Sequence, residues 1–189
     1  MENNYQTVVD EIFSLFELQG GNEYIGEPVT ILEHSLQSGQ LALDAEESPL
    51  VVLAAFFHDI GHLLPMEESE NMEGMGHLRH EILGAEFLLS KGLPDEMTTL
   101  VKNHVQAKRY LTFKYPKYYE QLSEASKTTL KYQGGVMTPS EAQVFEKHPL
   151  FKKSLQLRAW DEQAKLTDCL VQPLDFYKKL LLEFIVIKS

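Results

Sequence analysis

The segment from Leu50 to Phe57 is the feature that most constrains the fold of this chain, because all of its residues are apolar. A helix that is apolar on every face must be buried, so we expect a central helix over residues 50–59 that ends near Gly61. This helix carries His58-Asp59 at its end. Two ionisable groups at the end of a buried helix are unfavourable unless they are paired or bound to a metal.

Elsewhere, apolar residues recur at helical spacing, and no segment shows a convincing strand-like alternation. We expect further helices over residues 5–18, 29–44, 77–91, 94–108, 116–125, 149–165 and 173–186, and one that begins at Pro139. Loops are expected over 19–28, where mobility is predicted, over 66–75, and at Gly134-Gly135. The sequence therefore predicts an all-α bundle of about eight or nine helices in one domain of 189 residues.

The composition is that of a soluble globular protein, with 43% hydrophobic and 24% charged residues. The formal net charge of −11 disfavours nucleic acid and anionic membrane surfaces as partners. Cys169 is the single cysteine, so no internal disulfide is possible, which fits a reducing compartment. The first residues do not resemble a signal peptide, and we expect a cytoplasmic protein.

The adjacent pair His58-Asp59 suggests a metal site. On a regular helix these two side chains would diverge by about 100°. One metal can still bind both if the backbone leaves the helix there, and Gly61 favours such a break. The two oxygens of Asp59 could also bridge two metals. Imidazole with carboxylate suits Fe, Mn, Zn or Ni better than Mg or Ca.

The histidines and aspartates of the chain resemble those of a known family. The order of His34, His58-Asp59-Ile60-Gly61 and Asp161 resembles the HD-domain superfamily of all-α metalloproteins, most of which are phosphohydrolases. Two further histidines, His80 in HEILGAE and His104 in KNHVQAKRY, are similar to those of its two-metal subgroup. Within that subgroup, the sequence motifs around these histidines resemble those of the diiron oxygenases typified by myo-inositol oxygenase and the glycine-forming aminophosphonate oxygenases.

The resemblance implies a mixed-valence Fe(II)/Fe(III) centre with six metal ligands: His34, His58, Asp59, His80, His104 and Asp161. Asp59 would bridge one iron held by His34, His58 and Asp161 and a second iron held by His80 and His104. This set leaves coordination positions open for substrate and dioxygen. We expect His77 to be a surface residue and His148 to be structural or exposed.

Six other residues are candidate substrate contacts: Tyr24, Glu27, His62, Lys108, Ser126 and Arg158. A phosphonate needs cations or strong donors around its oxygens. Lys108 lies one helical turn after His104, and Arg158 lies three residues before Asp161, so each shares a face with an expected ligand. The resemblance implies phosphonate contacts at His62, Lys108 and Ser126. It also implies a lid that carries Tyr24 and Glu27, with Glu27 beside the substrate ammonium.

The activity that the resemblance implies is a dioxygenase reaction of organophosphonate catabolism. It cleaves the C–P bond of (R)-2-amino-1-hydroxyethylphosphonate with O2 and yields glycine and phosphate. Two alternatives remain open. A metal-dependent phosphohydrolase would use the HD ligands but leaves His80, His104 and Glu27 less well explained. A signalling module with a degenerate site would lack ligands, and none of the six is missing. Zn or Mn would fit the same ligands, so iron depends on the resemblance.

Overall fold

The structure is a computed structural model that describes residues 2–24, 26–65 and 77–188. This described part contains ten α-helices, one short 3-10 helix and no strand, so the all-α prediction is confirmed. In chain order the elements are α1 (Glu2–Gln19), α2 (Ile31–Asp44), α3 (Pro49–Phe57), the 3-10 helix η1 (Ile60–Leu63), α4 (His80–Ser90), α5 (Asp95–Lys114), α6 (Pro116–Gln121), α7 (Glu124–Tyr132), α8 (Pro139–Glu146), α9 (Phe151–Gln163) and α10 (Leu174–Lys188). The expected loop over 66–75 lies outside the described residues.

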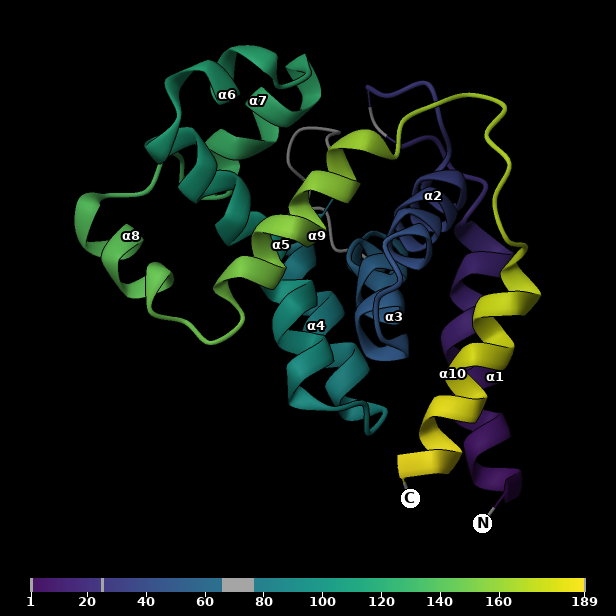
Figure 1. The fold of residues 1–189 in the computed structure, drawn as a ribbon. Coiled ribbons are helices and arrows are strands. Elements are labelled where there is room, and N and C mark those ends of the chain that lie inside the picture. The colour runs from purple at the N-terminus through teal and green to yellow at the C-terminus, as the bar shows by residue number, and fades with distance from the viewer. Residues whose placement is uncertain (1, 25, 66–76, 189) are drawn as a thin grey trace.

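Helix α3 lies at the centre of the molecule, in contact with α2, α5, α9 and α10 (Figure 1). Each of its residues from Leu50 to Phe57 is buried, as its uniform apolar character predicts. Its Phe56 ring stacks on Phe13 from α1 and on Tyr177 from α10, with ring centroids 5.7 and 4.5 Å apart. Burial of these rings holds α3 in place between α1 and α10, and with it the His58-Asp59 pair that follows its last residue.

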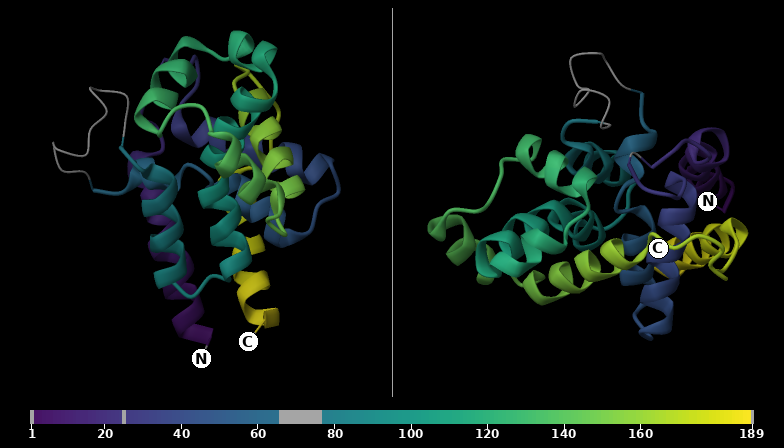
Figure 2. Two further views of the ribbon diagram at one scale, coloured as in Figure 1. Left: turned by 90° about the vertical axis from the view of Figure 1, so that its left-hand side faces the viewer. Right: turned by 90° about the horizontal axis from the view of Figure 1, so that it is seen from above.

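The first and last helices lie side by side, and α6, α7 and α8 cover a different part of the molecule (Figures 1 and 2). Helices α4 and α5 pack against each other, and α5 also packs against α9. The candidate site therefore draws on helices that are far apart in the sequence. No helix among the described residues is both long and apolar enough to cross a bilayer.

The structure divides the expected helix over 116–125 into α6 and α7. Leu122 is extended, and the hydroxyl of Ser123 accepts a hydrogen bond from the backbone N–H of Ser126 at 3.1 Å. This N-cap starts a new helix that continues to Tyr132. The capping preference of serine thus outweighs the helical periodicity that spans the junction, and it brings the polar residues of α7 to the candidate site.

Candidate metal centre

Local structure at the start of α2 positions His34. Thr30 caps the helix: its hydroxyl accepts a hydrogen bond from the N–H of Glu33, and the Glu33 carboxylate accepts one from the N–H of Thr30. This reciprocal capping box fixes the first turn of α2. His34 follows directly and is fully buried.

The backbone leaves the α-helix between His58 and Asp59. His58 is the C-cap of α3 with helical φ and ψ, whereas Asp59 has φ −105° and ψ 11° before the chain enters η1. This change lets two consecutive side chains face one site. At Gly61, an added Cβ would lie 2.0 Å from the carbonyl oxygen of His80, so only glycine allows η1 to approach α4 this closely.

His80 begins α4 directly after Arg79, which has a left-handed backbone with φ 64°. Such a conformation is unfavourable for a residue with a side chain and persists where packing requires it. On α9, the Arg158 guanidinium donates a hydrogen bond from Nη1 to Asp161 Oδ2. That bond orients Asp161 and leaves its other oxygen facing the histidines.

The two oxygens of Asp59 face different pairs of imidazoles. Oδ2 lies 3.5 Å from His34 Nε2 and 3.4 Å from His58 Nε2. Oδ1 lies 3.3 Å from His80 Nε2 and 3.4 Å from His104 Nε2. The structure therefore brings the expected bridging residue between the two expected histidine pairs.

Asp161 lies on the first side only. Its Oδ1 is 3.4 Å from His34 Nε2 and 3.8 Å from His58 Nε2. All six expected ligands converge, and each of their side chains is at most 5% exposed.

Hydrogen bonds from the Nδ1 atoms determine which imidazole nitrogens face the centre. The Nδ1 atoms of three histidines lie 2.6–2.8 Å from backbone carbonyl oxygens, and the pairs are His34 with Ala164, His58 with Ala55, and His104 with Val101. A carbonyl can only accept, so each Nδ1 carries a proton, and each Nε2 is the nitrogen that would bind a metal ion at the centre, where the ion would take the place of any proton on it. His80 Nδ1 instead lies 3.8 Å from the carboxylate of Glu81.

The charges at this centre favour a cation. Burial raises the pKa of Asp59, but His58 and His80 outweigh it and hold this pKa well below its usual value. Burial lowers the pKa of His58, but Asp59 and Asp161 outweigh it and raise the value to about 10. Asp59 Oδ2 is buried and has no hydrogen-bond partner among the described residues. The carboxylates thus carry buried negative charge, and positive charge beside them is favourable.

The spacing of the nitrogens fits metal ions at this place. The Nε2 atoms of His34 and His58 are 3.0 Å apart, and those of His80 and His104 are 3.1 Å apart. Two bonds of about 2.1 Å at a right angle place two nitrogens about 3.0 Å apart, whereas a tetrahedral angle places them about 3.4 Å apart. Both pairs therefore fit adjacent positions of a six-coordinate metal. The donor set of imidazoles and carboxylates suits iron and similar transition metals.

A cavity of about 320 Å³ opens beside this centre. Its lining includes Asp59, His80, His104 and Asp161 from the centre. All six residues that the sequence suggested as substrate contacts also line it: Tyr24, Glu27, His62, Lys108, Ser126 and Arg158. A small molecule bound here would touch both sets of residues.

One part of the cavity offers hydrogen-bond donors. Lys108 is 3% exposed and donates to the hydroxyl of Thr129 at 3.0 Å. Burial, and after it the charge of Arg158, lowers the pKa of Lys108 to about 7. Arg158 Nη2 is buried without a hydrogen-bond partner among the described residues. An anion in the cavity would satisfy this donor and stabilise the charged form of Lys108.

His62 stacks on His80, with ring centroids 4.0 Å apart. Burial, followed by the effect of His80, lowers the pKa of His62 well below its usual value. Its Nδ1 accepts a hydrogen bond from the backbone N–H of His77 at 3.4 Å, which leaves the neutral ring with Nε2–H as a donor. His62 also lies close enough to Asp59 and His80 to form a three-residue cluster of potential metal ligands.

Tyr24 and Glu27 belong to a hydrogen-bonded turn that precedes α2. The Tyr24 ring stacks on His34, with centroids 4.2 Å apart. Glu27 Oε1 accepts hydrogen bonds from Ser123 Oγ at 2.6 Å and from Lys165 Nζ at 2.5 Å. The expected amine-binding carboxylate therefore already has a cationic partner in this structure.

The prediction that His77 is a surface residue is wrong. His77 is 2% exposed, lines the cavity, and has its Nε2 3.0 Å from the carbonyl oxygen of Leu64. This contact across 13 residues has no signature in the local sequence. His148 is half-buried at the turn before α9, where its Nδ1 accepts a hydrogen bond from the N–H of Leu150, consistent with the structural role expected for it.

Sequence reasoning also missed several other residues that line the cavity, among them Thr129 and Gln133. Thr129 and Gln133 follow Ser126 by three and seven residues, so all three share one helical face along α7 and its C-cap residue, Gln133. Gln133 Oε1 is buried and has no hydrogen-bond partner among the described residues. A polar stripe at helical spacing was the available signal, and the expected boundary at residue 125 concealed it.

Comparisons with known proteins show which family this chain belongs to. The HD domain family matches residues 31–145. The chain is 42% identical over 187 residues to an uncharacterised protein, L432, of Acanthamoeba polyphaga mimivirus, covering 97% of this chain and 85% of that protein.

Two other relatives have named activities. The [1-hydroxy-2-(trimethylamino)ethyl]phosphonate dioxygenase (glycine-betaine-forming) of Leisingera caerulea is 39% identical over 165 residues, covering 87% of this chain and 84% of the relative. The hydroxymethylphosphonate dioxygenase of Gimesia maris is 36% identical over 175 residues, covering 91% and 87%. The chain therefore belongs to the HD-domain family and is related to these two phosphonate dioxygenases.

Proposed function

We propose that this protein is a diiron oxygenase that cleaves the C–P bond of a 1-hydroxyphosphonate, with (R)-2-amino-1-hydroxyethylphosphonate as its substrate. The observation that carries the proposal is the carboxylate of Asp59, whose two oxygens face separate histidine pairs beside one cavity. The named relatives support an oxygenase, because both are called dioxygenases and both names contain a hydroxylated phosphonate.

The residues present suit a pair of irons. His34, His58 and Asp161 would hold one ion, His80 and His104 the other, and Asp59 would join them. When bound, the two irons would supply the redox chemistry that uses dioxygen. In the overall reaction the C–P bond breaks, one oxygen atom of O2 enters the carboxylate of glycine, and the other enters phosphate, so the atoms balance.

The chain's own groups bind and orient the phosphonate. Lys108, Arg158 and the neutral ring of His62 offer donors at the cavity wall. Ser126 and Thr129 add hydroxyls on the neighbouring face of α7. This set would hold three phosphonate oxygens against the metal centre and restrict the orientation of the carbon that carries the hydroxyl group.

The amine end favours a primary ammonium over a trimethylammonium group. Glu27 accepts hydrogen bonds in this structure, and a primary ammonium can donate them whereas a trimethylammonium cannot. Quaternary ammonium groups are recognised mainly by aromatic cages. Among the described residues that line the cavity, Tyr24 has the only phenyl ring. With substrate bound, Tyr24 and the turn that carries it would close over the cavity and exclude water.

The test is oxygen uptake by the iron-loaded protein. We expect 2-amino-1-hydroxyethylphosphonate to consume O2 and release equal amounts of glycine and phosphate, faster than its trimethylamino and hydroxymethyl counterparts. Under nitrogen, no phosphate should appear from this substrate. Release of phosphate from a monoester under nitrogen, without oxygen uptake on any phosphonate, would instead identify a phosphohydrolase.

A further inference from the structure

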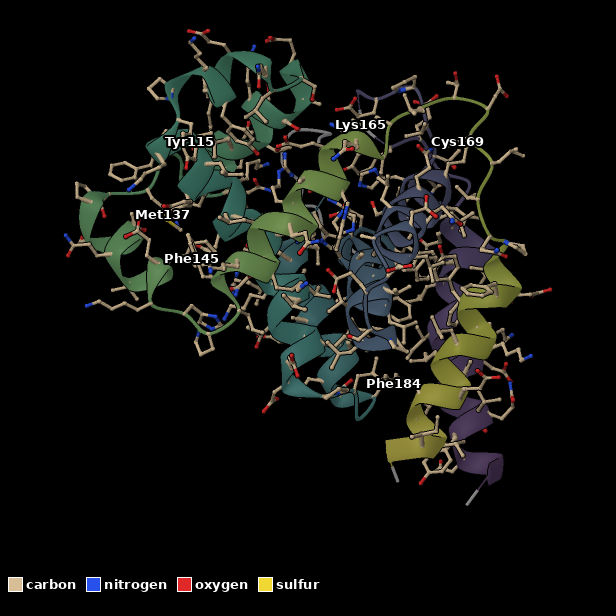
Figure 3. All side chains as sticks on the ribbon, viewed as in Figure 1. Tyr115, Met137, Phe145, Lys165, Cys169 and Phe184 are labelled. Carbon is tan, nitrogen blue, oxygen red and sulfur yellow. The ribbon has the colours of Figure 1, made fainter. Side chains whose placement is uncertain are left out.

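Lys165 is the cationic partner of Glu27 in this structure, although only Glu27 of the two is among the residues that line the cavity. Lys165 Nζ lies 2.5 Å from Glu27 Oε1, and Ser123 Oγ donates to the same oxygen at 2.6 Å. Lys165 follows the end of α9, Glu27 lies in the turn before α2, and Ser123 caps α7. Figure 3 shows Lys165 where the chain leaves α9. Three distant segments therefore meet at one carboxylate oxygen of the cavity wall.

This pair is more enclosed than an ordinary surface ion pair. The Glu27 side chain is 8% exposed and that of Lys165 is 17% exposed. Partial removal from water strengthens the attraction between opposite charges and makes an unpaired charge unfavourable. Glu27 lines the cavity, so its partner determines how much negative charge the cavity presents at this end.

The charge of Lys165 also reaches the other end of the cavity. Lys165 is among the groups that lower the pKa of Lys108, after burial and Arg158. A cationic ligand that replaced Lys165 at Glu27 would therefore change the charge balance around both ends of a bound aminophosphonate.

We propose that Lys165 tunes amine specificity as an internal counter-ion of Glu27, because it offsets the negative charge that the carboxylate presents to the ammonium group of the substrate. A phosphonate without an amine leaves the Lys165–Glu27 pair intact. An ammonium group that approaches Glu27 from the cavity meets a carboxylate that Lys165 already neutralises, so the pair lowers the gain in affinity that the amine gives. The inference rests on the proposed function, because it concerns the amine subsite of that same cavity.

The experiment measures binding in the iron-loaded protein under nitrogen, where no turnover occurs. The probes are 2-amino-1-hydroxyethylphosphonate and 1-hydroxyethylphosphonate, which differ only in the amine. We expect Lys165→Met to raise the ratio of their affinities, amine over no amine, about tenfold above that of the unaltered protein. Lys165→Arg keeps the charge and should leave the ratio near its original value.

Two further variants sharpen the result. Lys153→Met is the matched control, since Lys153 forms an ion pair with Glu47 at the same 2.5 Å but neither residue lines the cavity. It should not change the ratio. Glu27→Gln in the Lys165→Met background should abolish the increase, because the two residues act on the same group. Thermal unfolding of each variant confirms that it folds.

An unchanged or reduced ratio in Lys165→Met would overturn the inference, and so would an equal loss of affinity for both probes. In those cases oxygen uptake on phosphonates by the unaltered protein would leave the proposed function standing. If neither probe binds and no phosphonate drives oxygen uptake, the proposed function fails together with the inference.

Discussion

Asp59 Oδ1 lies 3.3 Å from His80 Nε2, while the other oxygen of the same carboxylate faces the opposite pair of imidazoles. A single buried side chain thus contacts both halves of the candidate centre. Asp161, in contrast, lies near only one half. The two aspartates are therefore expected to differ in how many metal ions depend on them.

Asp59→Ala should remove both metal ions, because each of them would lose a carboxylate oxygen. Asp161→Ala should weaken the binding of only the ion next to His34 and His58, and the ion next to His80 and His104 should stay bound. Metal content after dialysis, measured by plasma mass spectrometry, checks the difference. Equal metal contents in the two variants would contradict the bridging role.

Glu27→Ala should weaken binding of the aminophosphonate about 10- to 100-fold, because a charge-assisted hydrogen bond contributes about 1.5–3 kcal/mol. Iron content should stay near normal, since Glu27 contacts Ser123 and Lys165 rather than the expected ligands. Steady-state kinetics alongside iron analysis tests this. If turnover of the amine substrate were unaffected, the assignment of Glu27 as the amine anchor would be wrong.

Lys108→Met should stabilise the ligand-free protein at neutral pH. The pKa of Lys108 is about 7 in the folded chain against a usual 10.5, so between these values the unfolded chain binds one proton more. The destabilisation of the folded chain by the buried charge of Lys108 is therefore greatest below pH 7 and decreases as the pH rises toward 10.5. We expect urea unfolding at low pH to show a free energy of unfolding about 1–3 kcal/mol higher for Lys108→Met than for the unaltered protein. The variant should also bind the phosphonate more weakly.

The matched control for this prediction is Lys102→Met, because Lys102 lies on the exposed side of the same helix. It should show no gain that depends on pH. A gain of equal size at all pH values in Lys108→Met would point to packing rather than to the buried charge.

Gly61→Ala should destabilise the protein by about 2–4 kcal/mol and displace His80, because the added methyl group would meet the His80 carbonyl oxygen at 2.0 Å. Loss of one metal ion should accompany the lower unfolding temperature. Gly21→Ala is the control, since a Cβ there meets no atom within 4 Å. Normal stability and metal content in Gly61→Ala would refute the close approach of η1 to α4.

The sequence alone was sufficient for the fold class and for the central helix, because periodicity and the uniform apolar run from Leu50 to Phe57 are local signals. The turn at Asp59 was also foreseeable from Gly61. In contrast, α7 was missed because the N-cap at Ser123 interrupts an otherwise helical stretch. Local propensity does not decide between one long helix and two short ones when a cap competes with the periodic pattern.

Contacts between residues far apart in the chain could not be predicted from the sequence. Lys165 and Glu27 are 138 residues apart, and no local pattern relates them. The burial of His77 likewise depends on a backbone carbonyl in a different segment. The convergence of the six expected ligands came from a family resemblance, whereas the direction of each Asp59 oxygen required coordinates.

The most direct test of the central claim is Mössbauer and EPR spectroscopy of the iron-loaded protein, with and without 2-amino-1-hydroxyethylphosphonate. Two bridged ions predict two irons per chain with the spin coupling of an Fe(II)/Fe(III) pair, and a signal that changes when the aminophosphonate is added. A single iron per chain would contradict the account. Two uncoupled irons whose spectra do not change when the phosphonate is added would also contradict it.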